Sequence, residues 1–151
     1  MLIAAPALRL VAWGVLSAGL FACAFGEFRP DDPMGREITL GDAHKHYTDS
    51  VRWSKFDEAS GYIEPAERDA FLAQMPEPDL GRFTDWEGKP WSFDDPETRM
   101  KAVIEVTYRA YSMANPVEFK VKERQSWSRA DRANDWVVKS EFTGLDQFGA
   151  H

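Results

Sequence analysis

Cysteine and histidine are scarce in this sequence of 151 residues, which holds one cysteine and three histidines. A single cysteine cannot form an internal disulfide or a thiolate metal cluster. His44 and His46 are two positions apart, about 200° around a helix, so they cannot bind one ion together, and His151 is the last residue. Asp42 and His46 have the four-residue spacing of neighbours on a helix face, for which we expect a solvated contact. We therefore expect no metal and no other cofactor.

Several motifs are also missing. The sequence has no Gly-rich phosphate loop, no Gly-x-Ser-x-Gly nucleophile elbow and no paired zinc-ligand motif. Basic residues number 18 against 25 acidic ones, and this net charge of −7 argues against a nucleic-acid partner. The hydrophobic share of 44% is enough for a folded core. We expect one domain at this length.

Acidic residues are absent from the first 22 positions, where Arg9 is the only basic residue, and all 25 acids follow Cys23. An apolar run of about a dozen residues covers positions 10–21 and ends among small residues. This layout is typical of an export signal, and the run is shorter than the roughly 20 residues that span a bilayer. We predict a signal peptide over residues 1–22. An ordinary secreted protein and an uncleaved single-pass membrane protein are the alternatives.

The end of this segment, Leu20-Phe21-Ala22-Cys23, resembles the lipobox of bacterial lipoproteins. Leu20, Ala22 and Cys23 match, and Phe21 stands where the family usually has a small or β-branched residue. The resemblance implies cleavage after Ala22 and attachment of a diacylglyceryl group to the Cys23 sulfur, usually with a further acyl chain such as palmitate on the new amino group. In Gram-negative relatives an Asp after the cysteine favours the inner membrane. Ala24 at that position implies the outer membrane, facing the periplasm.

Cleavage would leave 129 residues with 17 basic and 25 acidic side chains. This acidic balance disfavours adsorption to anionic head groups, so the acyl chains on Cys23 would hold the protein at the membrane. Proline and glycine recur in residues 23–38, which we predict to be a flexible tether. Residues 39–145 form the predicted globular domain, and residues 146–151 form a C-terminal tail.

Helical periodicity dominates the first half of the domain. Thr39 and Asp42 resemble a capping box, which predicts a helix that begins at Thr39. Apolar residues then recur at steps of three and four, at Leu40, Ala43, Tyr47 and Val51. After a break at residues 53–55, a second short helix is expected on Phe56, Ala59 and Ile63, and a third from Glu64 and Pro65 up to Pro76.

Alternation with a period of two follows, beginning near Phe83. The predicted inward residues of three strands are Ala102, Ile104, Val106, Tyr108 and Ala110; Val117, Phe119, Val121 and Trp127; and Trp136, Val138 and Phe142. An earlier strand or bent pair is expected over residues 83–93. Helices followed by antiparallel strands predict an α+β fold. It resembles the NTF2-like, cystatin-like class, which implies a curved sheet of about four strands around an N-terminal helix.

Aromatic residues offer one mild functional hint. They either line a pocket at the mouth of the cone or fill the core, and core filling is the favoured interpretation. An exposed partner interface is a third option. The residues concerned are Trp53, Trp86, Trp91, Tyr108, Tyr111, Phe119, Trp127 and Trp136. Lys120, Lys122 and Arg124 place a basic row on one strand face, which indicates a solvated face or, alternatively, a site for phosphate or an anionic partner.

No residue is singled out as catalytic. The sequence thus predicts an exported, lipid-anchored bacterial protein with a non-catalytic binding or assembly domain that faces the periplasm. Its partner, a protein or a small molecule, is unknown. A pocket enzyme of the NTF2-like class, of the isomerase or dehydratase type, is the main alternative, because this fold hosts both enzymes and binding modules.

Overall fold

A computed structural model describes residues 33–129 and 136–149 of the chain. The helical elements come first: α1 (Pro33–Arg52), α2 (Phe56–Ser60), the 3₁₀ turn η1 (Pro65–Glu67) and α3 (Arg68–Gln74). The strands follow: β1 (Gly81–Gly88), β2 (Lys101–Ser112), β3 (Phe119–Arg129) and β4 (Trp136–Thr143), with a last 3₁₀ turn, η2 (Leu145–Phe148). The predicted lipobox, residues 130–135 and His151 lie outside the described residues.

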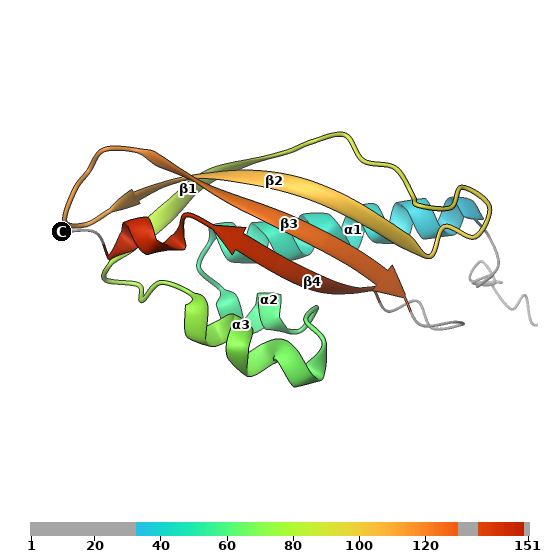
Figure 1. Ribbon diagram of the computed structural model, residues 1–151, viewed down its shortest axis with the longest axis horizontal. Coiled ribbons are helices and arrows are strands. Elements are labelled where there is room, and N and C mark those ends of the chain that lie inside the picture. Colours follow the sequence, from blue (N-terminus) through green and yellow to red (C-terminus); the bar gives the residue numbers. More distant parts are fainter. Residues whose placement is uncertain (1–32, 130–135, 150–151) are drawn as a thin grey trace, which may run out of the picture.

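The strands form one antiparallel sheet in the order β1-β2-β3-β4. The sheet is curved, and α1 runs along one side of it, with α2 and α3 near β4 (Figure 1). This confirms the predicted α+β architecture of helices followed by a four-stranded antiparallel sheet. The opposite face of the sheet carries the charged residues of β2 and β3, which alternate with the buried ones.

The first helix begins at Pro33, so the predicted start at Thr39 is wrong. Proline is well tolerated in the first turn, where its missing N–H would have no helical partner. The Thr39 hydroxyl donates to the carbonyl of Arg36 and accepts from the indole of Trp136, at 3.2 and 3.0 Å, so it joins the helix to the sheet instead of capping it. Residues 33–38, assigned to the tether from the sequence, are therefore helical. The predicted inner stripe is confirmed, since Leu40, Tyr47 and Val51 are all fully buried.

The two short helices are present, with one change. α2 begins at Phe56 as predicted, after a break where Ser54 has a φ of 56°. It ends at Ser60, so the prediction that it includes Ile63 is wrong, and Ile63 instead forms a β-bridge with Val138. Residues 65–67 form a 3₁₀ turn, so α3 begins only at Arg68. Each helix has one buried residue, Ala59 in α2 and Phe71 in α3, and the partly buried Phe56 and Leu72 also pack against the core.

The predicted alternation is confirmed in β2, where Ala102, Ile104, Val106, Tyr108 and Ala110 are all buried. In β4, Trp136 and Val138 are buried and Phe142 packs against the core. Val117 was predicted to face inward, but it precedes β3 and is 67% exposed, so that part of the prediction is wrong. Val117 belongs to the β2–β3 turn, where its backbone N–H donates a hydrogen bond to the side-chain oxygen of Asn115.

The end of the described chain packs into the domain. Phe148 in η2 is 2% exposed, and its ring lies 5.2 Å from that of Phe83 and 5.1 Å from that of Phe119, centre to centre. The packed domain therefore reaches at least Phe148, into the residues assigned to the C-terminal tail. Within the described part of the chain, no helix is both long and apolar enough to cross a membrane.

Candidate functional site

A buried carboxyl group lies between the sheet and α1. Glu123 of β3 is 2% exposed, and its side chain faces the helices. It accepts hydrogen bonds from the hydroxyls of Tyr47 and Tyr108 at 2.6 and 2.7 Å. The amide of Gln125, at 2.7 Å, and the hydroxyl of Ser140 donate as well. Four donors from one helix and three strands thus satisfy this single carboxyl group.

Burial decides the protonation behaviour of this cluster. Removal from water raises the pKa of Glu123 above its ordinary 4.5, although its hydrogen bonds act in the opposite direction. Burial and the neighbouring Glu123 charge also raise the pKa of Tyr47 and of Tyr108. Both phenols therefore keep their protons and remain donors at neutral pH.

The network continues from Gln125 to His44. The Gln125 side-chain oxygen accepts from the indole of Trp127 at 2.9 Å and lies 2.8 Å from Nδ1 of His44. An amide oxygen can only accept, so Nδ1 carries the imidazole proton in this contact. His44 is 7% exposed, and burial lowers its pKa below 6.5, which keeps the ring neutral at pH 7.

Trp127 fills much of the space between α1 and the sheet. Its ring makes edge contacts with Tyr47, Tyr62 and His44, at centroid distances of 5.7, 6.2 and 6.5 Å. These side chains occupy the region that a pocket under the sheet would need. They also satisfy one another's polar atoms, which is the arrangement of a rigid core.

The aromatic residues singled out in the sequence are divided among three environments. Tyr108, Trp127 and Trp136 are buried, whereas Trp86, Trp91 and Phe119 are half-buried against the core. Tyr111 is half-buried at the end of β2. Trp53 is 65% exposed, with the Arg52 guanidinium over its ring at 4.1 Å. The structure therefore spreads these residues over core and surface rather than gathering them around one ligand.

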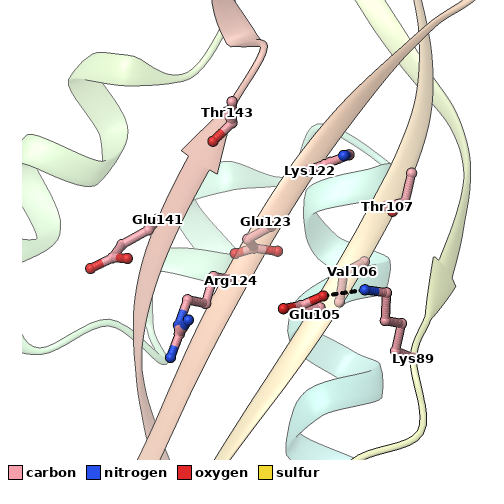
Figure 2. A pocket seen from close by; sticks show the side chains of 9 residues that line it. All are labelled: Lys89, Glu105, Val106, Thr107, Lys122, Glu123, Arg124, Glu141 and Thr143. Atoms are coloured by element: carbon pink, nitrogen blue, oxygen red, sulfur yellow. Dashed lines mark hydrogen bonds and ion pairs between the residues drawn. The ribbon is translucent and has the colours of Figure 1, made fainter.

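The outer face of the sheet is hollowed over its centre (Figure 2). The hollow measures about 350 Å³. Its lining comes from β2, β3, β4 and the residue that follows β1: Lys89, Glu105, Val106, Thr107, Lys122, Glu123, Arg124, Glu141 and Thr143. The predicted basic row is confirmed as exposed, since Lys120, Lys122 and Arg124 all lie on this face.

Neighbouring charges on this face are largely paired. Lys89 bridges Glu105, and Arg109 bridges Asp85. Lys139 lies 3.9 Å from Glu141. Among the described residues, Lys122 and Arg124 make no ion pair within 4.0 Å, so two cations in this hollow have donors to spare.

A second hollow of about 520 Å³ lies beside α1. Asp42 and His46 line it with Tyr62, Arg68 and Trp136. Arg68 donates to two backbone carbonyls there, at 3.0 and 3.3 Å. No group of three or more His, Cys, Asp or Glu in the described chain is arranged to hold a metal ion.

Sequence reasoning missed the two central polar residues, Glu123 and Gln125. Both have the same parity in β3 as Val121 and Trp127, which were correctly predicted to face inward. Successive side chains of a strand point to opposite faces, so the period alone places all four on the inner face. The signal was present, but polar residues were not expected there.

No family model matches this chain, and no curated protein resembles it in sequence. Function therefore has to be inferred from the residues and their geometry.

Proposed function

We propose that this chain is an exported, lipid-anchored bacterial protein whose domain faces the periplasm from the outer membrane and binds a partner or ligand without catalysis. One observation carries the proposal: the only cysteine stands directly after the apolar N-terminal run, with Leu20 and Ala22 in the positions that a lipobox requires. The first helix begins at Pro33, ten positions after Cys23, so the domain would lie close to its anchor.

We infer that the domain belongs to the NTF2-like class. The support is its element order and shape, with a long N-terminal helix, two short helices and a curved antiparallel sheet of four consecutive strands. The class includes binding modules and enzymes, so the choice between the two has to be argued from the residues of the site.

Binding without catalysis is favoured because the interior is occupied. Trp127 and the network around Glu123 fill the space between α1 and β3, and the carboxyl group has all its donors inside the protein. Recognition would then use the outer surface of the domain.

A pocket enzyme is the second candidate, and one observation favours it. Glu123 has a raised pKa and lies one side chain away from His44, which is the kind of pair that acid–base catalysis uses. Such an enzyme would have to move Trp127 to admit a substrate. A small molecule that shifts the NMR signals of Trp127, Tyr47 and Tyr108 together would support this candidate.

The anchor is tested by Cys23→Ser in a bacterial host fed radioactive palmitate. The wild-type protein should be labelled and shortened, whereas the variant should lose the label and keep its signal segment, because serine has no thiol to acylate. Ala24→Ser is the matched control, with the same new side chain one residue later, and it should be labelled like the wild type. Undiminished labelling of Cys23→Ser would refute the proposal.

A further inference from the structure

Phe148 of η2 fills a socket at one end of the sheet, just after β4 (Figure 1). Its side chain is 2% exposed, and its ring lies 5.2 Å from that of Phe83 and 5.1 Å from that of Phe119, centre to centre. Gly81 makes room for this ring, since a Cβ there would lie 2.6 Å from it. The socket is therefore shaped for one aromatic side chain.

Two polar contacts accompany the ring. The hydroxyl of Ser112, a residue that is 2% exposed, donates to the backbone carbonyl of Phe148 at 3.2 Å. The side-chain amide of Gln147 donates to the backbone carbonyl of Lys120 at 3.3 Å. Gln147 and Phe148 thus show what this site recognises, which is a side-chain amide followed by an aromatic residue of a peptide.

The hydrogen bonds that hold η2 are long. Those to the strands, through Ser112 and the Gln147 side chain, measure 3.2 and 3.3 Å. Those within the turn, from the backbone N–H groups of Gln147 and Gly149, measure 3.3 and 3.2 Å. Protein N–H···O bonds are usually about 2.9 Å long, and the two phenols of the buried network lie 2.6 and 2.7 Å from their acceptor. Apolar contacts of Phe148 and the partly buried Leu145 therefore hold η2 in place more than its hydrogen bonds do.

Gly144 and Gly149 flank η2. Gly144 has a φ of 97°, a left-handed conformation that favours glycine, and it turns the chain from β4 into η2. Asp146 and Gly149 are exposed, so η2 itself forms the surface over the socket. A rotation at Gly144 would move η2 away from the sheet and open the socket to solvent, with the strands in place.

We propose that η2 is a displaceable plug, and that its socket binds a peptide segment of a partner protein through an aromatic side chain. The inference rests on the proposed binding role of the domain, and it names a site and a class of partner. The plug is the template for this partner, because a competing segment would have to replace the contacts of Gln147 and Phe148. A partner binds only the open form, so its apparent affinity is reduced in proportion to the open fraction.

The octapeptide of residues 144–151 is the probe, titrated into the full-length unlipidated Cys23→Ser chain and followed by amide NMR shifts. When the chain also carries Phe148→Ala, which empties the socket, the peptide should bind saturably. The shifted signals should lie at residues 81–83, 110–112 and 119–120. The chain with an intact plug should bind the peptide at least tenfold more weakly, because its own Phe148 competes. The same octapeptide with Phe148→Ala should not bind saturably to either chain.

Gly144→Ala is a second variant, which leaves every socket residue in place and carries the test if Phe148→Ala does not fold. A Cβ at Gly144 would strain the turn and lie 2.8 Å from the Gln147 side chain, so peptide binding should become stronger. Phe71→Ala is the matched control, since this ring of α3 is 3% exposed and lies outside the socket. It should change the peptide affinity less than twofold from that of the intact plug. Equal strengthening by Phe71→Ala, or no binding by either plug variant, would overturn the site.

Hydrogen exchange tests whether the plug opens in the intact chain. The amides of Gln147 and Gly149 should exchange at least tenfold faster than those of β2, and exchange only at the rate of global unfolding would overturn the plug. A dimer of the intact chain that Phe148→Ala abolishes would overturn the assignment to a partner protein, because a second copy would be the occupant. Acylation of Cys23 is measured separately by palmitate labelling, so failure of the anchor is told apart from failure of this site.

Discussion

Glu123 is the residue with the most demanding environment in this domain. A fully buried carboxyl group loses its hydration, and among the described residues its four donors are two phenols, an amide and a hydroxyl, none of them a cation. Such donors stabilise the charge only in part, and the raised pKa expresses the remaining cost. The network therefore orients β3 against α1. At pH values above the ordinary pKa of a glutamate, the buried carboxyl group lowers the free energy of unfolding.

The pH dependence of stability tests this description of Glu123. A carboxyl whose pKa is raised on folding contributes its full stability below the unfolded value of 4.5 and loses it as pH rises through the folded value. Glu123→Gln does not titrate. The unfolding free energy of the wild type, relative to that of the variant, should therefore fall as pH rises from 4.5, as measured by urea denaturation at several pH values. A difference between wild type and Glu123→Gln that stays constant with pH would contradict the raised pKa.

Substitution by alanine should have opposite effects on stability at two glycines, one in α1 and one in β1. Gly41 lies inside α1 with open space at its Cβ position, so Gly41→Ala should raise the unfolding free energy by about 1 kcal/mol. A Cβ on Gly81 of β1 would collide with the carbonyl oxygen of Tyr111 and would lie 2.6 Å from the ring of Phe148. Gly81→Ala should therefore cost about 1–3 kcal/mol. Thermal and urea unfolding measure both, and equal effects of the two substitutions would show that this packing is wrong.

Substitution of two tryptophans tests how tightly the space between α1 and the sheet is packed. Trp127 of β3 is 1% exposed and touches α1, so Trp127→Ala should cost about 3–5 kcal/mol because it opens a cavity. Trp53 follows α1 and is 65% exposed, and Trp53→Ala should change stability by less than about 0.5 kcal/mol. Urea denaturation compares them. A small cost for Trp127→Ala would mean that the space under the sheet is loosely filled, as in a ligand pocket.

Sequence patterns predicted the elements better than their ends or their polar contents. The alternation in β2 was predictable because its inward residues from Ala102 to Ala110 are all hydrophobic. In β3 the same period holds, yet Glu123 and Gln125 face inward because Tyr47, Tyr108 and His44, all distant in sequence, supply their partners. Only the tertiary structure brings such partners together. The start of α1 at Pro33 was mispredicted because Thr39 has the residue type and spacing of a capping residue. In the structure its hydroxyl instead accepts a hydrogen bond from Trp136 on β4.

At the scale of the whole molecule, charge and chain order suggest an arrangement. Residues 33–80, which hold the helices, carry five basic and ten acidic residues, and α1 begins ten positions after Cys23. A fully extended stretch of that length spans about 35 Å, so an acylated Cys23 would keep the domain within that reach of the bilayer.

Intact-mass spectrometry of the protein extracted from bacterial membranes tests the central claim most directly. The account predicts a chain that begins at Cys23, lacks residues 1–22 and carries the added mass of two or three acyl chains on its first residue. A chain that retains residues 1–22 with an unmodified Cys23 would contradict it and would favour the single-pass membrane protein instead.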